Sequence, residues 1–206
     1  MEDHFAALNE PRRPWIDQDS VKARFLTLSA DVHPDRFHTA SETERGDANR
    51  RYAALNAAQS CLADTKSRTL HLLELEHGSR PEVVKNVPEE TMDMFLKVGQ
   101  LTRDVDAFID EKETTQSPLL KARLFEQGLQ WTDKLQSLQS DLNAQLAPLE
   151  AELQELNAAW EAAPSIGDPA RAGELPLSRL EEIGRVVSHL TRWNQQLQER
   201  IVRLSF

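Results

Sequence analysis

The stretch that decides the fold is FLTLSADVHPDRFH, residues 25–38. Apolar side chains that lead into it recur at spacings of 4, 3 and 4, which places them on one face of a helix. They are Val21, Phe25, Leu28 and Val32. Asp17, Asp19 and Ser20 are candidate N-caps for this helix. Because a proline disfavours the helical conformation of the residue before it, Pro34 predicts that the helix stops and that a loop spans 33–40.

Capping signals mark the helices on the far side of this loop. Ser41 and Glu44 form an S-x-x-E capping box, which predicts that a helix begins there. A short leucine-rich helix is expected after Asp64, and Gly78 suits its C-terminal end. A loop between two neighbouring helices predicts that they lie antiparallel. Residues 1–78 should therefore fold around a helical hairpin.

A second helical region follows a break at 79–88. One helix is expected over 89–111, and a long helical tract should run from Pro118 to about Ala162. The tract carries a heptad seam with spacings of 4, 3, 4, 3 and 4, formed by Leu142, Leu146, Leu149, Leu153, Leu156 and Trp160. Pro148 lies inside this seam and should kink the helix or split it in two.

The last helix follows a Pro- and Gly-rich loop at 163–176. It carries a second seam, formed by Leu180, Ile183, Val187, Leu190, Asn194, Leu197, Ile201 and Leu204. Two heptad helices joined by a short loop should form an antiparallel hairpin within one chain. The sequence thus predicts an all-α protein with helical regions at 1–78 and 89–206.

Composition excludes several classes of protein. The 206 residues carry 24 basic and 34 acidic side chains, a net charge of −10, which argues against nucleic-acid binding. No apolar stretch approaches the roughly 20 residues of a membrane-spanning helix, and the N-terminus lacks the pattern of a secretory signal. The single cysteine, Cys61, is expected to exclude an internal disulfide framework and any thiolate zinc cluster within one chain. A cytoplasmic location is expected.

The residues around the tripeptide His33-Pro34-Asp35, with ALNAAQSCLADTKSRTLHLLELEHG at 54–78, resemble a J-domain. More narrowly, they resemble the HscB-type J-proteins of iron–sulfur cluster assembly. The matching positions after the tripeptide are Asn56, Ala58, Leu62, Asp64, Arg68, Leu72, Leu73, Glu74, Leu75 and Gly78. The resemblance implies a J-domain at 1–78, a linker at 79–88 and a C-terminal bundle of about three long helices at 89–206.

The resemblance also implies a function. Such proteins dock on a DnaK/HscA-type chaperone ATPase, stimulate its ATP hydrolysis and deliver an iron–sulfur scaffold protein held by the bundle. The expected chaperone-binding residues are His33, Pro34, Asp35, Lys22, Arg24 and Arg36. Pro34 would stiffen the loop, and Asp35 could accept charge-assisted hydrogen bonds from the chaperone.

Residues 1–78 carry less positive charge than a basic docking face would supply. Residues 1–78 hold ten basic and thirteen acidic side chains, a net charge of −3, so weaker or more specialised docking is expected. The other interpretation of Lys22 and Arg24 is an ordinary solvated helix face.

The resemblance places a client-binding patch on Met94, Phe95 and Leu96. Relatives follow it with acidic residues, where this chain has Gln100, Arg103 and Ala107, and they add an aromatic residue near the position of His189. These departures leave the identity of the client open. The other interpretation is that Phe95 and Leu96 are ordinary core residues.

No enzymatic function is expected, since the sequence holds no nucleophile–base pair and no phosphate-binding loop. The histidines outside the tripeptide show no metal-ligand spacing, and Cys61 is expected in the core, so no cofactor or metal is expected. They are His4, His38, His71, His77 and His189.

Two further hypotheses on the function of the protein remain. One is a J-protein for another client, whose C-terminal helices mediate dimerisation. The other is a structural helical protein with an accidental tripeptide. A monomer or weak dimer is expected.

Overall fold

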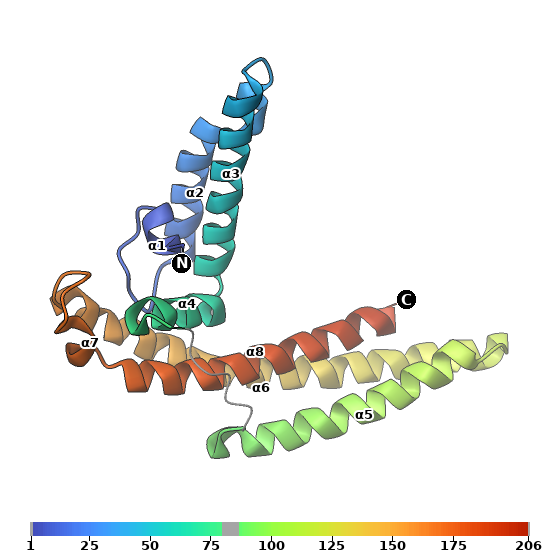
Figure 1. The fold of residues 1–206 in the computed structure, drawn as a ribbon. Coiled ribbons are helices and arrows are strands. Elements are labelled where there is room, and N and C mark those ends of the chain that lie inside the picture. The colour runs from blue at the N-terminus through green and yellow to red at the C-terminus, as the bar shows by residue number, and fades with distance from the viewer. Residues whose placement is uncertain (1, 80–86, 206) are drawn as a thin grey trace. The chain divides into compact units, whose positions relative to one another are not determined.

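The structure, a computed structural model, describes residues 2–79 and 87–205. All regular elements in these ranges are helical, which confirms the all-α prediction (Figure 1). No helix among them is long and apolar enough to cross a membrane. The elements are α1 (His4–Ala7), α2 (Gln18–Val32), the 3-10 helix η1 (Pro34–Phe37), α3 (Glu42–Ala63), α4 (Thr65–His77), the 3-10 helix η2 (Glu89–Thr91), α5 (Met92–Thr114), α6 (Pro118–Ala162), α7 (Arg171–Glu174) and α8 (Leu177–Ser205).

Packing divides the chain into two compact units. The first unit combines Met1–Val83 with Glu150–Gly184, and the second combines Val84–Leu149 with Arg185–Phe206. The two longest helices, α6 and α8, therefore each contribute residues to both units.

The domain boundaries expected from the sequence remain a prediction. The expected J-domain, 1–78, falls within the first unit, where the end of α6 and the start of α8 also pack. Most of the expected linker, 79–88, coincides with residues 80–86, which lie outside the described residues.

A helical hairpin dominates the first unit. Helices α2 and α3 lie side by side and antiparallel, and the loop between them contains η1 (Figure 1). The Asp17 carboxylate caps α2 by accepting from the backbone N–H of Ser20 at 2.9 Å. The predicted capping box of Ser41 and Glu44 is formed at the start of α3. Gly78 ends α4 with a φ of 73°, a conformation that glycine adopts without a steric penalty.

A buried arginine, Arg68, stabilises the end of the hairpin where α3 meets α4. Arg68 is 2% exposed, and its guanidinium donates to the carbonyls of Pro14 at 2.8 Å and Leu62 at 2.7 Å. Burial lowers the pKa of Arg68, because desolvation disfavours the charged form. Arg68 therefore links α4 by hydrogen bonds to the N-terminal segment and to the end of α3.

The end of α6 and the segment after it belong to the first unit. The side chain of Asn157 bonds both backbone groups of Trp15, at 2.9 and 3.0 Å. Arg171, on the short helix α7 that the sequence did not predict, donates twice to the buried carboxylate of Glu76, at 2.9 Å each. Trp160 donates to the same carboxylate at 3.3 Å. These bonds pair buried polar groups that would otherwise destabilise the fold.

The second unit packs α5 against parts of α6 and α8. Its buried core consists of Met94, Val98, Val105, Phe108, Ile109, Leu124, Leu135, Leu138, Leu142, Val186, Leu190, Trp193, Leu197 and Leu204. Helix α6 continues through Pro148, so the predicted split does not occur. At the seam position of Asn194, the side-chain amide donates to Asn143 at 2.8 Å, a polar pair of the kind that fixes helix register.

Candidate functional site

The tripeptide lies at the junction of α2 and η1. His33 has extended backbone geometry and ends α2, and Pro34 opens η1. The Asp35 side chain is 92% exposed and the His33 side chain is 44% exposed. The structure therefore presents the Asp35 carboxylate to solvent, where a partner could reach it.

Local contacts fix the orientation of the His33 ring. Its Nδ1 accepts from the backbone N–H of Asp35 at 3.3 Å, which leaves Nε2 to carry the proton of the neutral ring. The ring also meets Tyr52 of α3 edge-on, with centroids 5.3 Å apart. Tyr52 itself lies 6.4 Å from Phe25 of α2. Spacing along the sequence gave no sign that Tyr52 supports His33, because the contact joins two different elements.

Two further side chains stabilise the loop. His38 donates from Nδ1 to the carbonyl of Asp35 at 2.8 Å. Arg36 donates to the carbonyl of Ala30 at 2.9 Å and approaches the Asp31 carboxylate at 3.3 Å. The Arg36 side chain remains 61% exposed, so it shares its charge between this internal pair and solvent.

The other two expected basic residues differ from one another. Lys22 is exposed, and no ion pair involves it in the described part of the chain. Arg24 instead contacts the N-terminal segment. Its Nε lies 2.5 Å from the Glu10 carboxylate, which is fully buried, and its Nη1 donates to the carbonyl of Asn9 at 2.8 Å. Arg24 therefore has a structural role, which sequence spacing could not reveal.

This difference predicts separable effects for two alanine variants. Arg24→Ala removes a partner from a buried carboxylate and should cost roughly 1–2 kcal/mol of stability. Lys22→Ala should leave the melting temperature nearly unchanged, because surface substitutions usually cost little. If Lys22 steers the chaperone, its loss should slow association most at low salt. Thermal melts and stopped-flow binding at two salt concentrations measure both effects, and equal melting temperatures for the two variants would contradict the prediction.

The expected client-binding residues do not all lie on the surface. Met94 is 5% exposed and belongs to the core of the second unit, so its expected place in an exposed patch is corrected. Phe95 and Leu96 are 42% and 60% exposed, which argues against the core interpretation for both. Met92 is also exposed, at 40%, and can take the place of Met94 beside them.

Aromatic rings from α8 lie near this surface. The Phe95 ring lies 6.0 Å from the Trp193 ring, and His189 lies 5.6 Å from the same tryptophan. Gln100 is exposed and donates to Asp104 at 2.9 Å, so one carboxylate does stand next to the position where relatives are acidic. Trp193 and Asp104 were not among the client-binding residues expected from the sequence.

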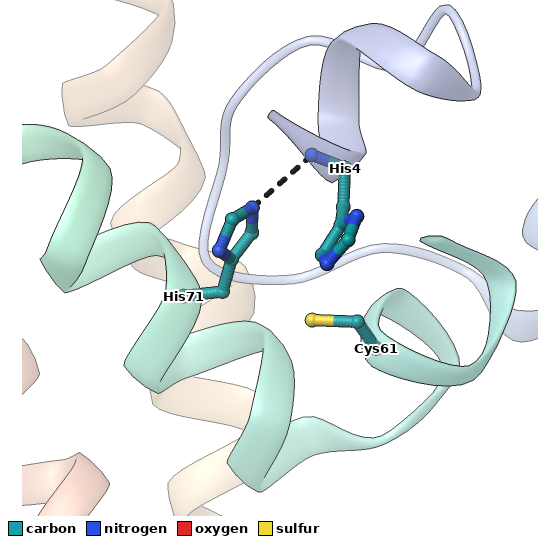
Figure 2. Close-up of side chains that lie close together, drawn as sticks. All are labelled: His4, Cys61 and His71. Atoms are coloured by element: carbon teal, nitrogen blue, oxygen red, sulfur yellow. Dashed lines mark hydrogen bonds between the residues drawn. The ribbon is translucent and has the colours of Figure 1, made fainter. Parts of the chain in front are cut away.

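One cluster contradicts the expectation for the histidines. His4, Cys61 and His71 come from three different helices of the first unit, and each offers a potential metal-ligand atom within 4.8 Å of the others (Figure 2). Sequence spacing missed this cluster because ligands from separate helices show no local pattern. A single cysteine excludes a cysteine-only zinc cluster but not a mixed one.

Comparisons with known proteins address the family. No protein-family model matches the chain. The co-chaperone protein HscB homolog of Bordetella petrii is 37% identical over 73 residues, which cover 35% of this chain and 43% of that protein. The match thus spans less than half of that relative's length. Among solved structures, human co-chaperone HscB aligns with 98% of this chain and 81% of its own, with a TM-score of 0.58 and 19% identity. Chaperone HscB from Vibrio cholerae aligns with a TM-score of 0.47, 21% identity, and 95% and 99% coverage.

A helical hairpin whose loop holds His33-Pro34-Asp35, with the Asp35 side chain exposed, is the arrangement that the resemblance to J-domains predicted. The similarity to the Bordetella protein confirms the predicted resemblance to HscB-type co-chaperones. The alignment with the human structure supports the fold alone, and it extends that support over nearly the whole chain.

Proposed function

We propose that this protein is an HscB-like co-chaperone that docks on a DnaK/HscA-type chaperone through the His33-Pro34-Asp35 loop and stimulates its ATP hydrolysis. The observation that carries the proposal is the exposure of Asp35 at the tip of the α2–α3 hairpin. The protein supplies no reacting group in this scheme, so it acts as a regulator of an enzyme and not as an enzyme. A cytoplasmic location remains a prediction.

The geometry suits such docking. The Asp35 carboxylate can accept a charge-assisted, bidentate pair of hydrogen bonds from an arginine of the chaperone. Pro34 and the contacts of His33 with Tyr52 order the loop before it binds, which reduces the entropy lost on association. Because His33 uses Nδ1 internally, its Nε2–H is the group available to donate to the chaperone.

A single-turnover ATPase assay tests this proposal. The chaperone is loaded with ATP, and hydrolysis is followed with and without this protein over a range of concentrations. Saturable acceleration is the expected result. Unchanged hydrolysis with DnaK- and HscA-type chaperones from the source cell would instead favour a structural helical protein with an accidental tripeptide.

We further propose that Met92, Phe95 and Leu96, with Trp193 beside them, bind an iron–sulfur scaffold protein. An exposed group of large apolar side chains next to an aromatic residue is the kind of surface that supplies interface hot spots. The carboxylate of Asp104 adds a polar edge one turn beyond Gln100.

The double variant Phe95→Ser and Leu96→Ser should weaken scaffold binding by about tenfold or more, because each residue would lose its apolar contact. Its free energy of unfolding should fall by less than about 1 kcal/mol, since both side chains are already exposed. Val98→Ser is the matched control, because Val98 is 3% exposed and its loss should lower the melting temperature clearly. Unchanged scaffold affinity in the double variant would refute the assignment of this surface.

The alternative is a J-protein with another client, whose C-terminal helices mediate dimerisation or client-specific binding. This alternative is favoured by Gln100 and Arg103, which stand at positions where the relatives carry acidic residues. A pull-down that recovers the chaperone but no scaffold protein would support this alternative over scaffold delivery.

A further inference from the structure

Three side chains with metal-ligating atoms meet at the base of the helical hairpin (Figure 2). His4 comes from α1, Cys61 from the end of α3 and His71 from the middle of α4. One potential ligand atom of each lies within 4.8 Å of those of the other two; His4 and Cys61 are half-buried and His71 is buried. The His4 and His71 rings are in contact, with centroids 4.5 Å apart.

The donor set selects a class of metal. One thiolate and two imidazoles suit Zn²⁺ and similar borderline cations, whereas Mg²⁺ and Ca²⁺ require oxygen ligands. Metal–sulfur bonds of about 2.3 Å and metal–nitrogen bonds of about 2.0–2.1 Å place tetrahedral ligand atoms roughly 3.3–3.6 Å apart. The cluster therefore needs to close by about 1 Å or somewhat more at its widest pair, which side-chain rotation can supply.

Burial acts in opposite ways on two of the ligands: it favours the neutral ring of His71 that can bind a metal, and it disfavours the thiolate form of Cys61. Burial lowers the pKa of His71, which favours the neutral ring that can act as a ligand. Burial also raises the pKa of the Cys61 thiol to about 11, so the thiol is protonated when no metal is bound. The Nδ1 atom of His4 is buried and has no hydrogen-bond partner in the described part of the chain. Ligation through this atom would give it a partner.

We propose that His4, Cys61 and His71 bind one Zn²⁺ ion, with a fourth position for water or an exogenous ligand. Binding forms a sulfur–zinc bond and releases the thiol proton to solvent, so charge and atoms balance. The Nε2 atom of His71 now accepts from the backbone N–H of His4 at 3.1 Å, and metal ligation displaces this hydrogen bond. The carboxylates of Asp3 and Glu74 act on His71 and offset the positive charge of the loaded site. The ion would cross-link α1, α3 and α4.

Cobalt titration of the full chain tests the site with a spectroscopic readout. Co²⁺ bound by a thiolate gives a sulfur-to-metal charge-transfer band, and tetrahedral Co²⁺ gives intense visible bands. Because Cys61 is the only cysteine, such a charge-transfer band can arise from no other residue. The expected result is saturation near one Co²⁺ per monomer, displacement by Zn²⁺, release of about one proton and a higher melting temperature.

Single variants distinguish this site from a cysteine acting alone. His4→Gln and His71→Gln should each weaken Co²⁺ binding by at least about tenfold, and Cys61→Ser should abolish the charge-transfer band. His77→Gln is the matched control, because His77 lies outside the cluster and pairs with Glu181. Absence of the band in the parent overturns the proposal. A band that survives both histidine variants, with one metal per two chains, also overturns it, because Cys61 would then bridge two molecules.

Discussion

Replacing Asp35 with Asn should reduce stimulation of the chaperone's ATPase to near background. The variant keeps the shape of the side chain but loses the charge that would accept bonds from an arginine of the chaperone. A loss of this kind at the centre of an interface costs at least about 2 kcal/mol, or roughly thirtyfold in affinity. His33→Gln should have a similar effect, because Nε2–H is the donor that the loop leaves available.

These variants should keep their fold. Asp35 is 92% exposed and its backbone N–H still donates to His33 in the asparagine variant, so the melting temperature should hardly change. Thr39→Ala, at an exposed position in the same loop, is the control and should stimulate like the parent. Full stimulation by Asp35→Asn and by His33→Gln would show that the loop does not work as proposed, even if the protein accelerates hydrolysis.

The largest loss of stability is expected from Leu153→Asp. Leu153 of α6 is 0% exposed, so the change removes a buried apolar side chain and puts an unpaired carboxylate in its place. The expected cost is at least about 3–5 kcal/mol, a large part of the stability of a typical domain. Gln154→Asp is the matched control, since the neighbouring side chain is exposed and its substitution should cost little.

The concentration dependence of this result decides whether the seam is formed within one chain. An intramolecular seam predicts that the parent and Leu153→Asp both melt at temperatures independent of protein concentration. Sedimentation should then find a monomer or a weak dimer. A parent that sediments as a tight dimer, with Leu153→Asp as a folded monomer, would show an intermolecular seam and would strengthen the dimerisation hypothesis.

Local signals predicted most of the helices. The capping box at Ser41 and Glu44, the N-cap at Asp17 and the glycine at 78 all lie where the structure begins or ends a helix. Such signals act over a few residues, so they can be found without tertiary information. At Pro148 the sequence predicted a kink or a split, and the split does not occur. Pro148 lies inside one continuous helix, although proline removes one backbone hydrogen bond of the helix. Burial of Leu142 before it and Leu153 after it can offset that loss.

The candidate sites were predicted unevenly. The tripeptide loop could be predicted because His33, Pro34 and Asp35 are consecutive in the sequence; their role in docking stays a prediction. The exposed members of the proposed client surface were predicted only in part. Phe95 and Leu96 are exposed but Met94 is buried, and an apolar run does not indicate which of its residues face solvent. The ion pair of Arg24 with Glu10 could not be predicted, because Glu10 lies fourteen positions away on a separate segment; the expected contact of Arg24 with the chaperone stays a prediction.

The sequence by itself determined the helical class, the ends of most helices, the hairpin and the exposed tripeptide, because each depends on neighbouring residues or on a helical period. Only the tertiary structure decided the partners of the long-range side chains. Arg68 contacts Pro14, Arg171 contacts Glu76, and His4 meets His71 sixty-seven positions away. Such pairs form because the packing of separate helices brings distant residues together, and the spacing along the chain carries no record of that packing.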